Sequence, residues 1–359
     1  MNKIAQRGLL KELILISLGT IDEFSCQVSE EDWRWLFRET QKQSIVGVLF
    51  LGIKRLPENQ RPPKILLIDW YGATLLIEQL NKQQVEKVKE ISLFFERGGF
   101  RSCLLKGQGI ALLYPDPFLR QCGDIDLWVE GSRDRIVEFC KKQWTIDHVD
   151  VKNMVVNSIP KVHLEVHFIP SWFYNPFTNK KFRNWYRLQW DRQFEKQNDE
   201  YFTIPDIEFN LVYCLSHIYK HHFDEGIGLR QMMDYYFILL HSTVDERNKA
   251  ISTLKDLGMF NFAGAAMYVM KDWFAIEDCY LLCRPDSRLG KSLMDTILEG
   301  GNFGHYDERN AHGQENRLTH GIRNMRHNLR LLSDYPSEVI WSPLWKVWHW
   351  CWRKSKGYL

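Results

Sequence analysis

Apolar residues recur at every third or fourth position through the first part of the chain, which is the spacing of one face of an α-helix. The pattern is clear over residues 5–18 and again over 63–98, where Pro63 suits the start of a helix. Ser29, followed directly by acidic residues, has the composition of a helix N-cap. We therefore predict a helical region over residues 1–99.

The hydrophobic period changes near residue 100, where short runs of alternating apolar and polar residues stand between helical stretches. This arrangement predicts an α+β fold, with a small mixed sheet formed by residues 100–204 between two helical regions. The last two strand-like runs are joined by Ser-Ile-Pro, which favours a hairpin. The strand-like runs are 102–105, 124–129, 150–157 and 161–168, and the helix-like runs are 107–114 and 132–142.

Helical periodicity returns in the last part of the chain and predicts a C-terminal helical region over residues 205–359. A polar, glycine-rich stretch at 300–317 interrupts it and has the composition of a loop. The predicted helices of this region are 206–222, 228–241, 244–257, 288–299 and 318–333.

Composition narrows the range of functions. The chain has 359 residues, of which 45% are hydrophobic, enough for a globular protein of two or three domains. Its 47 basic and 45 acidic residues give a net charge of +2. A charge this small argues against a protein whose whole surface binds a long nucleic acid electrostatically. The eight cysteines form no Cys-x-x-Cys pair, as in a reduced, cytoplasmic protein, and no apolar run is long enough to predict membrane insertion.

Two aspartates interrupt the apolar strand-like run at 124–129. Residues i and i+2 of a strand point to the same side, so Asp124 and Asp126 share one face while Ile125 and Leu127 lie on the other. Two carboxylates this close repel each other unless a cation, a basic side chain or open water compensates their charge. The pair is therefore a candidate ligand set.

The later run at 161–168 repeats the design, with His163, Glu165 and His167 on one face. If the two strands are neighbours, Glu165 approaches the aspartates, and three carboxylates form a site of the oxygen ligands that Mg²⁺ or Mn²⁺ prefers. The two histidines have two interpretations, which are contact with the metal or nucleotide and simple lining of a polar cleft.

A Lys-Gly-Gln-Gly turn precedes the aspartates, between a strand-like and a helix-like run. Glycine allows the backbone to approach a ligand closely, and free N–H groups at the start of a helix favour an anion. We predict that Lys106, Gly107 and Gln108 contact the phosphates of a nucleotide, with Arg120 as a further positive charge.

Taken together, Lys-Gly, an apolar segment ending in Tyr-Pro, Arg-x-x-Gly-Asp-Ile-Asp-Leu and Glu-Val-His-Phe resemble the uncharacterised nucleotidyltransferase family of the polymerase-β-like superfamily. The resemblance is strongest over 104–168. It implies a minimal nucleotidyltransferase core, with Asp124 and Asp126 as metal ligands and Glu165 as the third carboxylate. It also implies transfer of a nucleoside monophosphate from an NTP to a hydroxyl acceptor, with release of pyrophosphate.

The C-terminal helical region contributes weaker candidates. The motif His217-x-x-Lys220-His221 puts polar side chains on one helix face, where Lys220 or His221 could approach the triphosphate. The zinc-protease pattern is absent from this helix. Arg230 and Asp234, four residues apart, have the spacing of an ion pair on a helix surface.

Several alternatives stay open. The superfamily usually has Gly-Ser or Gly-Gly at the turn, so Gln108 also suits a catalytically degenerate nucleotide-binding or interaction module. The near-neutral charge favours a small molecule or a protein as acceptor over long RNA. The tryptophan-rich, basic C-terminus either docks on the core or lies on an anionic membrane surface.

Overall fold

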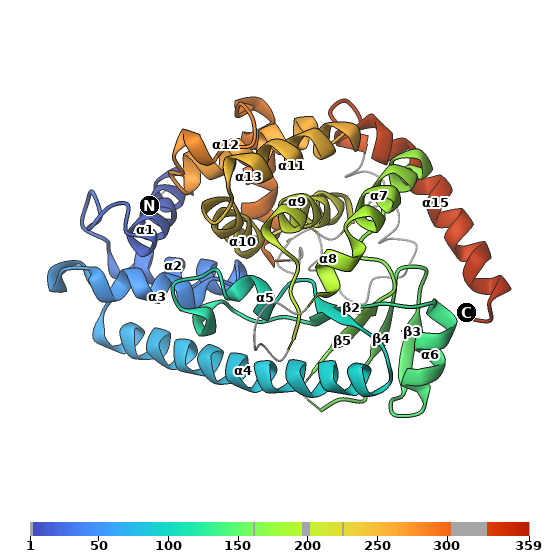
Figure 1. Cartoon of the computed structure of the whole chain (residues 1–359). Coiled ribbons are helices and arrows are strands. Elements are labelled where there is room, and N and C mark those ends of the chain that lie inside the picture. Colours follow the sequence, from blue (N-terminus) through green and yellow to red (C-terminus); the bar gives the residue numbers. More distant parts are fainter. Residues whose placement is uncertain (1–2, 161, 196–201, 225, 303–328, 359) are drawn as a thin grey trace.

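The computed structural model describes residues 3–160, 162–195, 202–224, 226–302 and 329–358 (Figure 1). The predicted N-terminal helices are present, and Ser29 is an N-cap whose side chain accepts a hydrogen bond from the Asp32 backbone N–H at 3.2 Å. Within the predicted helical region 1–99, the separate helix at Val46–Arg55 was not delimited from the sequence, because nearly all of its residues are apolar. The helices of this part are α1 (Lys3–Leu18), α2 (Glu30–Lys42), α3 (Val46–Arg55) and α4 (Lys64–Arg97).

The described residues form one five-stranded mixed sheet in the order β1-β2-β5-β4-β3. Strand β2 runs parallel to β5, and the other neighbouring pairs are antiparallel. The predicted hairpin of β4 and β5 is confirmed, whereas β3 was not predicted. The strands are β1 (Ser102–Leu104), β2 (Ile125–Val129), β3 (Ile146–Val149), β4 (Asn153–Val156) and β5 (Leu164–His167).

Helices cover both faces of this sheet (Figure 1). One face, which includes Ile125, Leu127 and Val166, packs on the C-terminal half of α4 and on α6 (Arg133–Lys141). The opposite face carries Asp126 and Trp128, and the Trp128 ring packs against aromatic rings of three helices. These are α7 (Pro176–Leu188), α8 (Trp190–Phe194) and α9 (Ile207–Asp224). Strand alternation thus places the acidic positions toward the C-terminal helices.

The helices after residue 205 lie on this acidic side of the sheet, and α15 runs along the edge of the molecule (Figure 1). Among the helices of the described ranges, none has both the length and the apolar character needed to cross a bilayer. Most of the predicted loop 300–317 and of the predicted helix 318–333 lies outside the described residues. The remaining helices are α10 (Leu229–Leu240), α11 (Val244–Asp256), α12 (Phe260–Trp273), α13 (Ser287–Gly300) and α15 (Pro336–Ser355).

The α+β class is therefore confirmed: the molecule is rich in helices and has one small mixed sheet. Its largest apolar core joins residues of α1 to α4 with residues of α9 to α13, and a second core lies under the sheet. The division at 1–99, 100–204 and 205–359 stays a prediction.

Candidate active site

The three predicted carboxylates lie together at one end of the β2–β5 pair. Asp126 is directly opposite Glu165 in the parallel register, and Asp124 lies two residues before Asp126 at the start of β2. Asp126 is 6% exposed, Glu165 is half-buried and Asp124 is exposed. The strand pairing thus forms an acidic group that is open to solvent on one side.

The buried His167 contacts two of these carboxylates through one ring nitrogen. Its Nε2 lies 3.0 Å from Asp126 Oδ1 and 3.4 Å from Glu165 Oε2. Burial alone would lower the pKa of His167, but the hydrogen bonds to Asp126 and Glu165 raise it above its ordinary value. The two carboxylates thus favour the protonated form of His167, and its Nδ1 has no hydrogen-bond partner among the described residues.

Lys106 approaches the same aspartate from the turn after β1. Its Nζ lies 3.0 Å from Asp126 Oδ2 and 2.9 Å from Nε2 of His217 on α9. Burial, followed by the charge of Lys106, holds the pKa of His217 well below its ordinary value, so the neutral ring can accept a hydrogen bond from the ammonium group. Burial would raise the pKa of Asp126, but Lys106 and His167 together lower it.

Asp124 has the least compensated charge of the three. Its Oδ1 lies 3.4 Å from His163 Nδ1, and both side chains are about half exposed. Partial burial, followed by the negative charge of Asp126, raises the pKa of Asp124 above its ordinary value. A cation at this position would relieve that repulsion.

The donor atoms fit a divalent metal. Asp124, His163 and Glu165 offer one set of ligand atoms, and Asp126, Glu165 and His167 offer another, each within 4.8 Å of one another. Glu165 belongs to both sets, and its Oε2 also accepts a hydrogen bond of 2.7 Å from Asn153 Nδ2. Carboxylate oxygens suit Mg²⁺ or Mn²⁺, and the imidazole nitrogens add ligands that Mn²⁺ accepts more readily than Mg²⁺.

The turn before these carboxylates requires glycine. Gly107 has φ +62°, and a Cβ added there would lie 3.7 Å from the Asp124 carbonyl oxygen. The following helix α5 (Gln108–Ala111) has only one turn, shorter than the predicted 107–114, so its dipole is small. The buried Gln108 side chain donates hydrogen bonds to Asn81 and Gln84 of α4, at 2.8 and 2.7 Å.

Arg120 lies apart from the acidic group, in a buried ion pair. Its Nε and Nη2 donate to the two carboxylate oxygens of Asp234 at 2.6 and 2.7 Å, and the Tyr114 hydroxyl donates to Oδ1 at 2.6 Å. The prediction that Arg230 and Asp234 lie on a helix surface is wrong, because both residues are buried, and the carboxylate of Asp234 is bound by Arg120. Arg230 also donates to the backbone carbonyl of Gln121 at 3.1 Å.

The two remaining candidates lie along α9. The centroids of the His221 and His217 rings are 4.3 Å apart. His221 therefore contacts the histidine that contacts Lys106. Lys220 points elsewhere, because its Nζ lies 5.6 Å from the Tyr174 ring and 5.8 Å from the Trp345 ring of α15. The structure thus brings the carboxylates and Lys106 together and leaves Arg120 and Lys220 in other contacts.

Three contacts of this group were not predicted from the sequence: His167 with two carboxylates, His217 with Lys106, and Asn153 with Glu165. The contact of Asn153 could have been predicted, because the predicted hairpin places Asn153 beside the strand that carries Glu165. The Lys106–His217 contact spans 111 positions, and local spacing carries no information about it.

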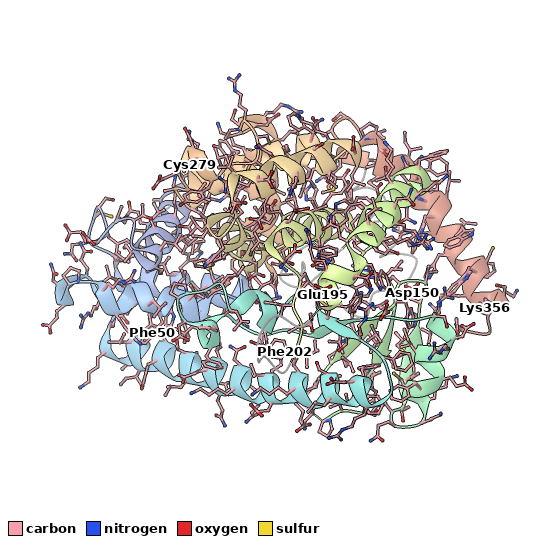
Figure 2. The ribbon with its side chains drawn as sticks, viewed as in Figure 1. Phe50, Asp150, Glu195, Phe202, Cys279 and Lys356 are labelled. Carbon is pink, nitrogen blue, oxygen red and sulfur yellow. The ribbon has the colours of Figure 1, made fainter. Side chains whose placement is uncertain are left out.

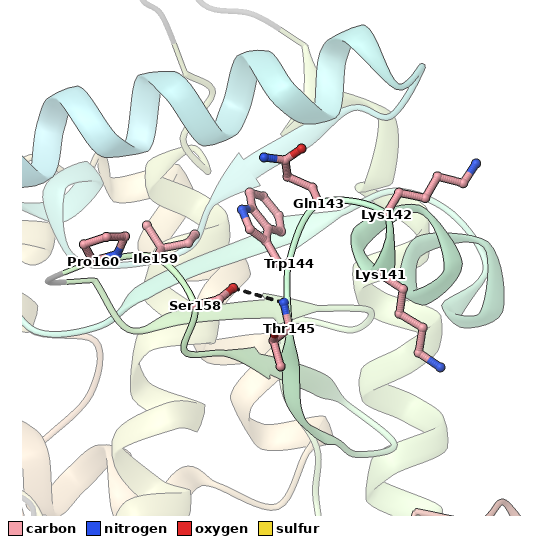
Figure 3. Close-up of a pocket in the computed structure, with 8 residues that line it drawn as sticks. All are labelled: Lys141, Lys142, Gln143, Trp144, Thr145, Ser158, Ile159 and Pro160. Carbon is pink, nitrogen blue, oxygen red and sulfur yellow. Dashed lines mark hydrogen bonds between the residues drawn. The ribbon is translucent and has the colours of Figure 1, made fainter.

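A cavity of about 460 Å³ lies elsewhere, between the end of α6 and the β4–β5 turn (Figure 3). Trp144, Thr145 and Ser158 line it, together with Lys141 and Lys142, and it contains no carboxylate or histidine. Because the ionisable groups that can perform chemistry converge at the β2–β5 pair, we place the candidate site there.

Similarity to known proteins identifies the family of the chain. A family model described as an uncharacterised nucleotidyltransferase matches residues 29–275, whereas no curated protein matches the chain significantly. Two solved structures resemble it weakly, a Thermotoga maritima CCA-adding enzyme complexed with tRNA and a CCA-adding enzyme complexed with CTP. For each, the identity is 14%, the coverage 78% of both chains and the TM-score 0.19, too low to inform the site. Since the family model spans more than half of the chain, the protein belongs to the uncharacterised nucleotidyltransferase family.

Proposed function

We propose that the protein transfers a nucleoside monophosphate from an NTP to a hydroxyl acceptor, with Mg²⁺ or Mn²⁺ held by Asp124, Asp126 and Glu165. The observation that carries the proposal is the register of the parallel strands, in which Asp126 lies opposite Glu165, with the exposed Asp124 directly before β2. Membership of a nucleotidyltransferase family supplies the reaction class.

The donor set supports a metal-dependent reaction. A divalent ion bound by these carboxylates would neutralise triphosphate oxygens and polarise the phosphorus that is attacked. Asn153 and His167 hold Glu165 in place, at 2.7 and 3.4 Å, so this ligand is oriented before any substrate arrives. Asp124, the most exposed of the three, faces the solvent side from which an NTP would enter.

We assign Lys106 to the phosphates of the NTP. Its ammonium group already lies in the acidic group, 3.0 Å from Asp126 Oδ2 and 2.9 Å from His217 Nε2. Gly107 brings the backbone of the same turn close to Asp124. The side chain of Gln108 donates hydrogen bonds to α4, so we assign any contact of this residue with phosphate to its backbone N–H.

In the proposed reaction, the acceptor oxygen forms a bond to the α-phosphorus while the bond from that phosphorus to the bridging oxygen breaks, and pyrophosphate leaves. Glu165 completes the metal site or takes the hydroxyl proton. Burial would raise the pKa of Glu165, but the hydrogen bond from His167 lowers it, so Glu165 is ionised at neutral pH, which suits a metal ligand better than a general base. The near-neutral net charge of +2 favours a small molecule or a protein as acceptor.

The proposal is tested by pyrophosphate release from the common NTPs, with Mg²⁺ or Mn²⁺ and with cell extract as the source of acceptor. We expect metal-dependent release by the wild type and a loss of at least about a hundredfold in Asp124→Asn. Asp124 is exposed, so this variant keeps the fold, and Glu138→Gln on α6 is the matched control for removing an exposed carboxylate. Equal release by wild type and Asp124→Asn would overturn the assignment.

The same assay separates the enzyme from the degenerate module that Gln108 suggested. A module would be stabilised by NTP and metal in a thermal-shift measurement but would release no pyrophosphate with any acceptor fraction. An enzyme gives both signals, and Asp124→Asn weakens both.

A further inference from the structure

Among the described residues, helix α15 contacts the rest of the protein through one of its faces. On that inner face, Glu338 accepts hydrogen bonds from the backbone N–H groups of Tyr174 and Asn175, at 2.7 and 3.2 Å. One end of the helix is held by His349, whose Nε2 lies 2.6 Å from Asp150 Oδ1. Figure 2 labels Asp150 on the side of the molecule that carries α15 and Lys356. The helix is thus firmly attached through one side.

The opposite face is apolar and exposed. Ile340, Leu344 and Val347 are separated by four and three residues, so they form one stripe along the helix, and they are 57%, 57% and 65% exposed. Cys351 continues the stripe by one more turn. Trp348 and Trp350 lie at its two sides and are 46% and 54% exposed.

Positive charge accompanies this stripe. Lys346, Lys354 and Lys356 are exposed, and the single acidic residue of α15, Glu338, is buried on the inner face. The surface continues onto α7 through Phe177, which is 68% exposed and whose ring lies 6.0 Å from the Trp341 ring. Helix α7 contains no acidic residue and four basic ones, namely Lys180, Lys181, Arg183 and Arg187.

We propose that the outer face of α15 binds the surface of an anionic lipid bilayer, with the helix lying parallel to the membrane. Its 20 residues span about 30 Å, long enough to lie along a bilayer surface. Aliphatic side chains between tryptophans and lysines match the acyl boundary and the anionic headgroups. RNA fits this face less well, because Ile340, Leu344 and Val347 offer a nucleic acid neither charge nor aromatic stacking.

The test is co-sedimentation of the full-length protein with vesicles of phosphatidylcholine and phosphatidylglycerol, compared with vesicles of phosphatidylcholine alone. We expect binding to the anionic vesicles, weakened by high salt, and a loss of at least about tenfold in the partition coefficient of Leu344→Glu/Val347→Glu. These two side chains are mostly exposed, so the double variant should keep the thermal midpoint of the wild type.

The matched control is Ile68→Glu/Leu76→Glu, which makes the same change at two apolar positions of α4 that are 59% and 56% exposed. We expect it to bind anionic vesicles like the wild type. Equal binding of wild type and α15 variant, or no preference for anionic vesicles, would overturn the proposal. It would also fail if the α15 variant lost binding to an RNA oligomer or broke up a dimer while the wild type ignored vesicles.

Discussion

One buried carboxyl group on α15, that of Glu338, predicts how the stability of the protein depends on pH. Glu338 is 5% exposed, and its two carboxylate oxygens accept hydrogen bonds from the Tyr174 and Asn175 backbone N–H groups. Burial raises the pKa of Glu338 to about 7, and these hydrogen bonds only partly oppose that effect. In the folded protein, Glu338 therefore keeps its proton at pH values where an exposed glutamate has lost it.

The sign of the pH dependence follows from proton binding. Between the ordinary pKa of 4.5 and the folded value of about 7, the folded state binds more protons than the unfolded state, so this group makes stability fall as pH rises. Each pH unit in that window changes the free energy of unfolding by about 1.4 kcal/mol, so the protein loses on the order of 3 kcal/mol of stability across it. Below this pH window Glu338 contributes its full stabilisation, and above it we expect Glu338 to cause no further change in stability.

Glu338→Gln isolates the pH dependence because glutamine does not titrate, although its NH2 group cannot accept one of the two backbone hydrogen bonds. We expect that loss to cost about 1–3 kcal/mol at every pH, and we expect the stability of the variant relative to the wild type to rise by about 3 kcal/mol from pH 5 to pH 8. Urea denaturation at several pH values measures the difference, in which the contributions of other groups cancel. A difference that stays constant from pH 5 to pH 8 would refute the reasoning.

Three other substitutions, one of them with a matched control, test contacts of the turn and of the buried pair. Arg120→Met leaves the Asp234 carboxylate buried without its cation and should cost about 3–5 kcal/mol in urea denaturation; a cost below about 1 kcal/mol would contradict the pairing. Gly107→Ala, at φ +62°, should cost about 1–3 kcal/mol and lower turnover, whereas Gly72→Ala, with open space around the added Cβ, should gain up to ~1 kcal/mol; the reverse order would be inconsistent with the turn geometry. Lys106→Gln should lower kcat/KM for the NTP at least about tenfold, and an unchanged value would remove Lys106 from the phosphate site.

Periodicity predicted the parts of the site that lie on strands. Because side chains alternate along a strand, the faces of Asp124, Asp126 and Glu165 could be assigned from the sequence, and the parallel pairing of β2 with β5 confirms that these residues are neighbours. The resemblance of the surrounding motifs supplied the family, which the match over 29–275 confirms.

Contacts between distant segments could not be predicted in this way. Arg120 and Asp234 are 114 positions apart, and the helical spacing of Arg230 and Asp234 gave no sign of this buried pair because it considers a single helix. The role of Gln108 depends on Asn81 and Gln84 of α4, which pack against the turn only in the folded chain. In both cases tertiary packing, rather than local pattern, decides which polar groups meet.

The most direct test of the central claim follows the phosphorus atoms. The protein is incubated with Mg²⁺ or Mn²⁺, cell extract and NTPs radiolabelled either at the α-phosphate or at the γ-phosphate. The account predicts that label from the α position becomes attached to an acceptor, that label from the γ position leaves in pyrophosphate, and that Asp124→Asn abolishes both. Label from the γ position on the acceptor, or transfer that survives in Asp124→Asn, would contradict it.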